Sequence, residues 1–568
     1  MNRKINKVAV IGSGIMGSGI ACHFANIGIE VLLLDIVPNK LSDVEIKKNL
    51  SLEDNSVRNR IVNESLAKAI KSKPSPLYHR NFKNRITTGN LTDDLEKISD
   101  SDWIIEVVIE NLEIKNQVFK EIEKYRKDGT IITSNTSGIP IKFMSSDRSE
   151  DFQQHFAVTH FFNPPRYLKL FEIVPGPNCK NEVIEFLNMF GEKFLGKTSV
   201  LAKDTPGFIG NRIGNFGIQD LFHNMKALDI SLEDLDTLTG PLIGRPKSAT
   251  FRTADLVGID TLSRVSNGIY ENCPDDECRD VFVTPDFIKD MLEKNWLGDK
   301  TGQGFYKKTR DKNGKRKILV LDFESMEYRK MNKTKFDVVR KAKKIENTID
   351  RFKVLINGDD KVSEFYRKTL AGMFSYAQNR IPEISDDIYS IDDAVKAGFG
   401  WENGPFEVWD AIGIEEGIRL MESYGKKPAK WVEELVNSDN NGFYNIKNGF
   451  TYYYDIYEKK YLIKPGQESF IILDNIRKSN LVWENEEFVI EDIRVEGLKR
   501  ITPGTVFNYL PIKVGDTFND SLSSDSVRAL FKTGLFRDVK LARDGDVLVV
   551  TVVERETISE ITFEGNQA

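Results

Sequence analysis

The chain has 568 residues, of which 40% are hydrophobic and 29% charged, and 80 Lys and Arg residues against 86 Asp and Glu residues give a net charge of −6. At roughly 150 residues per domain, this length predicts three or four domains. Because there is no basic excess, we expect no nucleic-acid partner. Because the apolar runs stay far below the roughly 18 residues that cross a bilayer, we expect no membrane span.

Cysteine content and the first residues bear on the compartment. Four cysteines are too few for a disulfide scaffold and fit a reducing environment. The first residues lead directly into the apolar run Val8-Ala9-Val10-Ile11, without the apolar segment of a signal peptide. We therefore expect a cytoplasmic protein.

A glycine-rich turn follows this first predicted strand. Gly12 permits a tight turn, Gly14 lets a pyrophosphate approach the backbone, and Gly17 lets the next helix pack on the strand. A second apolar run ends at Asp35, whose carboxylate would bind a ribose diol and repel a 2′-phosphate. The pattern predicts NAD as the cofactor. The alternative is an unrelated α/β turn, with Asp35 capping a helix.

Further apolar runs, separated by helical stretches, continue the pattern of a doubly wound parallel sheet. They are residues 103–105, 130–133 and 158–159. Ligands in such folds lie outside the carboxyl ends of the strands, so the residues at those ends are candidates for function.

One of only five histidines lies in a predicted hairpin. If the chain reverses around residues 164–166, antiparallel pairing places His160 opposite Glu172. A carboxylate there would fix the tautomer of the imidazole and stabilise the imidazolium, so His160 is a candidate general base. The alternative is a histidine that is merely hydrogen-bonded inside a sheet.

Five segments, in this order and spacing, resemble the L-3-hydroxyacyl-CoA dehydrogenases. They are residues 12–19, 106–115, 134–137, 160–172 and 204–212. The resemblance covers residues 1–485. It implies an NAD-dependent enzyme of fatty-acid β-oxidation that oxidises a 3-hydroxyacyl-CoA to a 3-oxoacyl-CoA.

By position in these motifs, the resemblance implies the roles of individual residues. His160 would be the general base and Glu172 its partner, while Ser137 and Asn211 would hydrogen-bond the reacting oxygen. Further cofactor contacts are implied for Glu110, Lys115, Asn163 and Lys300. We expect no metal site.

From residue 204 onward the pattern is helical, and part of it recurs. The recurrence pairs Phe251, Asp255 and Gly258 with Phe406, Asp410 and Gly413. Longer members of the resembled family carry two copies of this helical domain, the second in place of the partner subunit of short dimeric forms. The resemblance therefore implies a dehydrogenase part that can act as a monomer.

The carboxyl-terminal part has a different pattern, in which a strand is followed by two helices and paired strands. Residues 488–556 resemble the POTRA domain of outer-membrane β-barrel assembly factors, which binds partner chains by strand addition. Residues 490–497 recur as residues 558–565, the start of a second copy. Because POTRA domains act in the periplasm, whereas NAD chemistry belongs in the cytoplasm, we hypothesise a truncated or chimeric appendage.

The expected fold class is an α/β Rossmann-type doubly wound domain, followed by two all-α helical domains and a small α+β POTRA-like domain. The expected segments are an NAD-binding domain (1–203), a helical dehydrogenase C-terminal domain (204–308), a lysine-rich linker with a hairpin (309–365), a second degenerate helical repeat (366–430), a linker (431–487), the POTRA-like domain (488–556) and a truncated second POTRA repeat (557–568). Two alternatives stay open. One is a periplasmic outer-membrane-assembly interaction protein with a passenger Rossmann domain, and the other is a different β-hydroxyacid dehydrogenase that uses a catalytic lysine.

Overall fold

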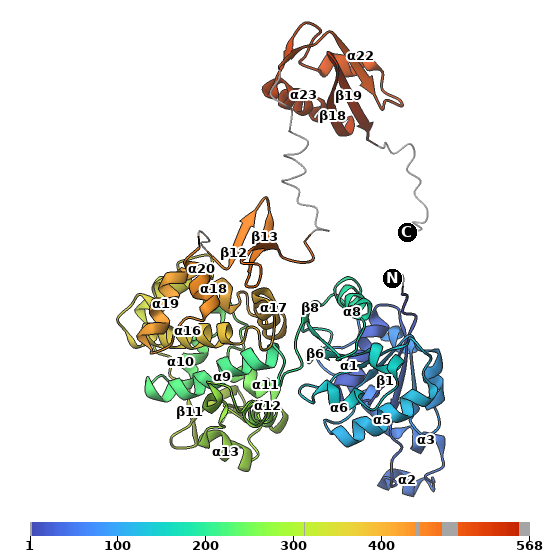
Figure 1. Cartoon of the computed structure of the whole chain (residues 1–568), viewed down its shortest axis with the longest axis vertical. Coiled ribbons are helices and arrows are strands. Elements are labelled where there is room, and N and C mark those ends of the chain that lie inside the picture. The colour runs from blue at the N-terminus through green and yellow to red at the C-terminus, as the bar shows by residue number, and fades with distance from the viewer. Residues whose placement is uncertain (1–2, 312, 439–441, 468–486, 556–568) are drawn as a thin grey trace. The chain divides into compact units, whose positions relative to one another are not determined.

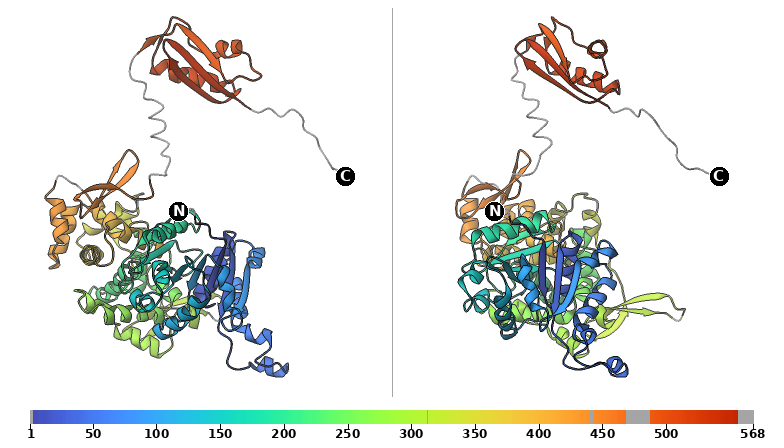
Figure 2. Two further views of the ribbon diagram at one scale, coloured as in Figure 1. Left: turned by 45° about the vertical axis from the view of Figure 1, so that its right-hand side comes forward. Right: turned by 90° about the vertical axis from the view of Figure 1, so that its right-hand side faces the viewer.

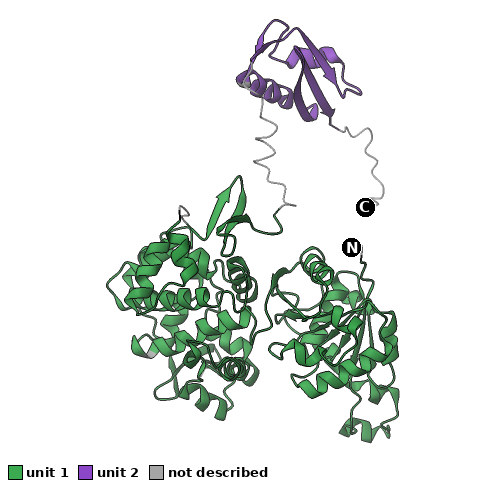
Figure 3. Ribbon diagram, in the orientation of Figure 1, with its two compact units in different colours: residues 1–467 green, residues 468–568 purple. Residues whose placement is uncertain are grey.

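The computed structural model describes residues 3–311, 313–438, 442–467 and 487–555 (Figure 1). The chain forms two compact units, residues 1–467 and residues 468–568 (Figure 3). The second unit has a hydrophobic core that it does not share with the first. The predicted second POTRA repeat, residues 557–568, lies outside the described residues.

An eight-stranded sheet forms the centre of the amino-terminal domain, in the strand order β3-β2-β1-β4-β5-β6-β7-β8. The strands are β1 (Lys7–Ile11), β2 (Glu30–Asp35), β3 (Ile86–Asn90), β4 (Trp103–Glu106), β5 (Ile131–Ser134), β6 (Phe156–Phe161), β7 (Leu170–Pro175) and β8 (Thr198–Leu201). All neighbouring strands are parallel except β6 and β7, which are antiparallel. The doubly wound sheet expected from the sequence is confirmed.

Helices cover both faces of this sheet (Figure 2). They are α1 (Ile15–Asn26), α2 (Asp43–Lys47), α3 (Asn55–Arg58), α4 (Arg60–Lys71), α5 (Leu112–Tyr125), α6 (Ile141–Ser145), α7 (Glu150–Gln154) and α8 (Asn181–Lys193), with the short 3-10 helices η1 (Arg80–Arg85) and η2 (Leu95–Asp100). Alternate residues of β1 face two cores: Ala9 and Ile11 lie in one, Val8 and Val10 in the other. Burial on both faces explains why the strands are continuous apolar runs.

The first helical copy consists of helices followed by a small antiparallel sheet. Its elements are α9 (Gly210–Ala227), α10 (Leu232–Leu238), η3 (Pro241–Ile243), α11 (Phe251–Val257), α12 (Ile259–Asn272), η4 (Arg279–Phe282), α13 (Asp286–Glu293), η5 (Asp299–Thr301), β9 (Tyr306–Arg310), β10 (Arg316–Asp322) and β11 (Glu327–Lys330). The predicted hairpin is present, because β9 and β10 pair on either side of Gly314, whose φ is +78°.

The second helical copy follows two connecting helices, α14 (Asp337–Ala342) and α15 (Arg351–Ile356). Its elements are α16 (Lys361–Asn379), α17 (Ile388–Phe399), α18 (Pro405–Ile412), α19 (Ile414–Ser423), α20 (Lys430–Val436), β12 (Tyr444–Lys447), β13 (Phe450–Asp455) and β14 (Lys460–Ile463). The predicted linker at 431–487 is therefore wrong for residues 431–467, which complete this copy. Residues 468–486 lie outside the described part of the chain.

Buried aspartates show that the two copies share one framework. Asp255 accepts backbone N–H bonds from Phe305 and Tyr306, at 2.7 and 2.9 Å. Asp410 accepts the matching bonds from Phe443 and Tyr444, at 2.7 and 2.8 Å. In each copy, the carboxylate thus ties the helices to the first strand of the small sheet.

Two glycines and a pair of tyrosines extend the match. Gly258 and Gly413, which end α11 and α18, have the same φ of +102°. Tyr306 donates its hydroxyl to Asp236 at 2.7 Å, as Tyr444 does to Asp392 at 2.8 Å. The duplication is thus longer than the recurring motif showed, because the sheet strands belong to it.

The described part of the second unit, residues 487–555, contains two helices and two small sheets, with the strand orders β16-β19-β18 and β15-β17. Its elements are β15 (Phe488–Val489), β16 (Asp492–Glu496), α22 (Pro503–Tyr509), β17 (Thr517–Phe518), α23 (Asp520–Lys532), β18 (Phe536–Asp544) and β19 (Val547–Glu554). Glu554, at the end of β19, accepts the backbone N–H groups of Lys499, Arg500 and Ile501. No helix in the described part of the chain is both long and apolar enough to span a membrane.

Candidate active site

The glycine turn between β1 and α1 leaves space in front of the helix. A Cβ at Gly12, where φ is +103°, would lie 2.6 Å from the carbonyl oxygen of Val107, and a Cβ at Gly17 would overlap the carbonyl group of Gly12. At Gly14, by contrast, no described atom outside the glycine and its two chain neighbours lies within 4 Å of the position of a Cβ. Helix α1 has no side-chain cap and no acidic residue in its first turn, so its positive end is open to an anion.

Asp35 ends β2 beside this turn. Its Oδ2 atom accepts hydrogen bonds from the backbone N–H and the hydroxyl of Ser13, at 2.6 and 2.5 Å. Its Oδ1 atom accepts the N–H of Ile36 at 2.7 Å. The carboxylate predicted to bind a ribose is thus held at the carboxyl edge of the sheet, next to the glycine turn.

Lys115 lies in a buried cluster with two glutamates. Its Nζ atom is 2.8 Å from Oε1 of Glu106 and 3.4 Å from Oε2 of Glu110. Burial raises the pKa of Glu106, and Lys115 opposes this rise. The Lys115 side chain is only 1% exposed and that of Glu110 is 43% exposed, so Glu110 is the member of the cluster that can meet a ligand.

Ser137 lies in the loop after β5 and contacts the same cluster. Its backbone N–H donates to Oε1 of Glu110 at 3.0 Å, and its hydroxyl is 3.5 Å from the same atom. Thr136 also donates its hydroxyl to this oxygen, at 2.5 Å. The structure therefore brings together three of the predicted residues, Ser137, Glu110 and Lys115.

His160 and Glu172 face each other across the antiparallel pair β6 and β7, in the register expected from their spacing. The Nδ1 atom of His160 is 2.6 Å from Oε2 of Glu172. The side chain of Glu172 is completely buried, and that of His160 is 9% exposed. We call this pair the dyad.

The second oxygen of Glu172 is held by the start of α9. Oε1 accepts the backbone N–H groups of Ile209 and Gly210, at 3.0 and 2.8 Å. Asn211 follows directly in the first turn of this helix. A carboxylate with three donors is fixed in place, and Asn211 is the next residue after the two that hold it through their backbone.

Two phenylalanines flank the imidazole of His160. The ring centroids of Phe162 and Phe208 lie 5.1 and 5.6 Å from its own, both in edge contacts. Among the residues that the structure describes, none forms a hydrogen bond with its Nε2 atom. The imidazole is therefore oriented by Glu172 through one nitrogen and free to accept a proton on the other.

Family models match both parts of the first unit. A model for the "3-hydroxyacyl-CoA dehydrogenase, NAD binding domain" matches residues 7–205, and one for the "3-hydroxyacyl-CoA dehydrogenase, C-terminal domain" matches residues 207–308 and 365–452. The chain belongs to the 3-hydroxyacyl-CoA dehydrogenase family. A third model, for the POTRA domain, described as "Surface antigen variable number repeat", matches residues 488–555.

Individual dehydrogenases agree with this membership. A Bacillus subtilis protein named "Probable 3-hydroxyacyl-CoA dehydrogenase" is 47% identical over 455 residues, which are 80% of this chain and 57% of the relative. The human "Hydroxyacyl-coenzyme A dehydrogenase, mitochondrial" is 33% identical over 303 residues, 53% of this chain and 91% of the relative. The chain thus spans little more than half the length of the Bacillus relative.

A solved dehydrogenase has the same fold. The crystal structure of 3-hydroxybutyryl-CoA dehydrogenase from Escherichia coli K12 matches with a TM-score of 0.53 and 21% identity, over 76% of this chain and 98% of that one. At this identity the match concerns the fold alone.

Two predicted residues of the dehydrogenase site are not joined to the others. Asn163 is exposed in the turn between β6 and β7. Lys300, in η5, forms an ion pair with Asp260 of α12, which ties it to the first helical copy. These contacts give no support to a cofactor role for either residue, so both roles stay predictions.

Sequence analysis missed two features of the dehydrogenase site. Glu106 ends β4 and binds Lys115 with both oxygens, at 2.8 and 3.0 Å. Its position at the carboxyl end of a strand was the available signal. The backbone N–H groups that hold Glu172 gave no signal, because backbone donors are the same in every residue.

Proposed function

We propose that the first unit catalyses the NAD-dependent oxidation of L-3-hydroxyacyl-CoA to 3-oxoacyl-CoA, as in fatty-acid β-oxidation. The observation that carries this proposal is the dyad, with one nitrogen of His160 bound to Glu172 and the other free. A pair of this kind suits proton abstraction from an alcohol. The buried His23 also has a ring nitrogen without a hydrogen-bond partner among the described residues, but its other nitrogen meets only a backbone carbonyl oxygen. His160 differs because its Nδ1 atom meets a buried carboxylate that two backbone N–H groups hold in place.

In the proposed reaction, His160 accepts the proton of the 3-hydroxyl group on Nε2. Glu172 binds the Nδ1–H group, which keeps the lone pair on Nε2, and stabilises the imidazolium that forms. Because Glu172 is itself held by Ile209 and Gly210, the imidazole keeps its orientation during the transfer.

Ser137 and Asn211 are the proposed donors to the reacting oxygen. Negative charge develops on this oxygen as the proton leaves, and hydrogen bonds placed in advance stabilise it. Both residues are partly exposed, and so available to a substrate. Ser137 is positioned through Glu110, and Asn211 through the first turn of α9.

The glycine turn fits the proposed NAD, since the space at Gly14 and the open end of α1 would accept its pyrophosphate. Gly12, Gly14, Gly17 and Asp35 would hold the adenosine half. On the nicotinamide side the proposed contacts are Glu110, Asn163 and Lys300, and the buried Lys115 would act through Glu110, which lies 3.4 Å from its Nζ atom. When bound, NAD would accept the hydride from C3 of the substrate.

The test is NADH formation with 3-hydroxybutyryl-CoA by the purified full chain. His160→Gln should lower kcat by a factor on the order of 10² or more, because the base is lost. His223→Gln is the matched control, since His223 is exposed and binds only the carbonyl oxygen of Val281 among the described residues. An active wild-type protein with an unchanged His160→Gln variant would exclude this mechanism.

For the organisation of the chain, we propose the domains predicted from the sequence, with the first helical domain extended from residue 308 through β11 and the second helical repeat extended through β14. Because that repeat takes the place of a partner subunit, we propose a monomeric dehydrogenase part, to be checked by sedimentation. We propose a cytoplasmic location, which agrees with four free cysteines.

For the POTRA-like unit, we propose that it binds an extended peptide at an edge strand, β16 or β18. Whether this unit and the dehydrogenase are joined in the genome is testable by sequencing across the codons for Trp483 to Val489. An intact frame that is expressed in cells would contradict the hypothesis of a chimera.

A further inference from the structure

Behind the dyad, a buried network of charges joins the two helical copies. It begins with Arg212, one residue after Asn211 in the first turn of α9, whose side chain is completely buried. One amino group of Arg212 is 2.6 Å from Oδ2 of Asp276 and 2.9 Å from Oε1 of Glu383. Its Nε atom donates to the hydroxyl of Tyr376 at 2.7 Å.

Tyr376 links the two sides of this network. Its hydroxyl donates to Oδ2 of Asp276 at 2.8 Å, and its ring stacks on Phe216 of α9 with the centroids 3.9 Å apart. Tyr376 belongs to α16, and Glu383 follows that helix, so both come from the second copy. Asp276 comes from the first copy, in the loop after α12.

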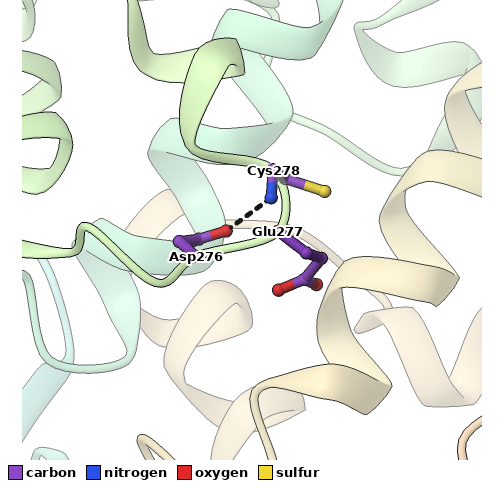
Figure 4. A group of neighbouring side chains, drawn as sticks. All are labelled: Asp276, Glu277 and Cys278. Atoms are coloured by element: carbon purple, nitrogen blue, oxygen red, sulfur yellow. Dashed lines mark hydrogen bonds between the residues drawn. The ribbon is translucent and has the colours of Figure 1, made fainter.

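The acidic side of the network has the composition of a metal site but is otherwise engaged. Asp276, Glu277 and Cys278 have ligand atoms within 4.8 Å of one another (Figure 4). Asp276, however, binds Arg212, Tyr376 and the N–H of Cys278, and Glu277 pairs with Arg380. Cationic and hydroxyl donors therefore already occupy the positions that a metal ion would need.

Two buried nitrogens of this network already lack a hydrogen-bond partner among the described residues. They are NH1 of Arg212 and Nε of Arg380. Removing the Tyr376 hydroxyl would leave Nε of Arg212 unpaired as well, which is unfavourable for a buried charged group. Removing the charge of Glu383 would leave Asp276 as the only carboxylate on NH2 of Arg212 among the described residues. The first turn of α9 would then lose contacts that tie it to the second helical copy.

We propose that Arg212 is a positioning residue for the dyad, held in place by Tyr376 and Glu383 of the second helical copy. The same turn of α9 carries Gly210, whose N–H holds Glu172, and Asn211, which is proposed to bind the reacting oxygen. A rotation of this turn would move both groups away from the reacting atoms. The second copy therefore contributes to turnover without touching the substrate, an inference that rests on the proposed function.

The test compares two single-atom changes with a matched control in the full chain. Tyr376→Phe removes one hydroxyl, and Glu383→Gln removes one charge. Arg329→Met is the control, because it breaks an ion pair of 2.6 Å with the buried Glu233 in the same helical region but away from α9. For each protein, kcat, the KM for NAD and the melting temperature are measured.

We expect Tyr376→Phe and Glu383→Gln to lower kcat about tenfold or more, since small displacements of catalytic groups slow reactions strongly. The KM for NAD should not change, because the network does not touch the glycine turn. The control should keep the kcat of the wild type even if it melts earlier. A drop in kcat that follows melting temperature in all three variants would contradict the proposal.

The design separates the two hypotheses. If the wild-type chain forms no NADH, the proposed function fails. If the wild type is active, His160→Gln is inactive and Tyr376→Phe equals the wild type, only the positioning role of Arg212 fails. Tyr376→Phe retains the aromatic stack on Phe216, so this variant should fold even if Arg212→Met does not.

Discussion

The two helical copies share a framework but differ at the start of their first helices. In the first copy, the N–H groups of Ile209 and Gly210 at the start of α9 bind Glu172 of the dyad. In the second copy, the corresponding helix α16 is capped by its own Asp360, which accepts the N–H groups of Val362 and Ser363, at 3.0 and 2.9 Å. The N–H groups at the start of α9 therefore bind the glutamate of the dyad, whereas those at the start of α16 bind the side chain that caps their own helix.

This difference teaches how a duplicated domain can keep its fold and change its role. The buried aspartates, each of which accepts two or more backbone N–H groups, are retained in both copies. Losing such a carboxylate would leave several buried donors unpaired. The helix end is less constrained, because a single capping residue satisfies it.

The largest expected difference between the copies concerns Asn211. Asn211→Ala should lower kcat by about 10² to 10³, as expected for the loss of one donor to a developing oxyanion. The control is Ser363→Ala in the first turn of α16, which removes a buried hydroxyl without a hydrogen-bond partner among the described residues. Steady-state kinetics of the two variants are the test. Equal losses of kcat in both would contradict the proposal that only the first turn of α9 serves the active site.

The framework itself should respond equally in the two copies. Asp255→Ala and Asp410→Ala each leave two backbone N–H groups without an acceptor, and each should lower the free energy of unfolding by about 2 kcal/mol or more. Denaturant titration of the full chain measures both. A large effect in the first copy with none in the second would show that the second framework is dispensable.

A smaller effect is expected where the second copy packs near the dyad. The ring centroid of Phe399, in α17, lies 6.0 Å from that of Phe162, and the ring of Phe162 in turn contacts the imidazole of His160. Phe399→Leu keeps most of the apolar volume, so kcat/KM should fall by less than about tenfold, which corresponds to 1.4 kcal/mol. A loss as large as that of Asn211→Ala would mean that Phe399 itself contacts the substrate.

The smallest and most local effect is expected in the POTRA-like unit. Here too a carboxylate accepts backbone N–H groups, since Glu554 binds those of Lys499, Arg500 and Ile501. These N–H groups lower the pKa of Glu554 to about 2. The stabilisation should be complete above the pKa of the unfolded chain, near 4.3, and lost as the pH falls toward 2. The protection of amides in this unit against hydrogen exchange, measured relative to the intrinsic exchange rate at each pH, should fall over that range in the wild type and not in Glu554→Gln.

Much of the amino-terminal domain could be predicted because its signals are local. The glycine spacing of Gly12, Gly14 and Gly17 reflects steric limits within one turn, and the structure shows those limits at Gly12 and Gly17. The pairing of His160 with Glu172 was equally accessible, since a short connection between neighbouring antiparallel strands limits their register.

The second copy was predicted only in part, since its ties are long-range. The strands at residues 444–463 are short and partly polar, and Asp410 binds them across the α19 and α20 helices. A pattern of four to six residues carries little information about such a partner. The sequence therefore predicts only a linker for this segment.

The sequence by itself determined the doubly wound sheet, the phosphate-binding turn and the histidine with its carboxylate, because each depends on neighbours a few residues away. The tertiary structure alone decided that α9 holds Glu172, that Lys115 is enclosed by two glutamates, and that Arg212 meets Tyr376 of the second copy. These arrangements depend on how separate elements pack. The sequence does not show which partner a backbone donor or a buried charge will have, because the partner depends on which elements pack together.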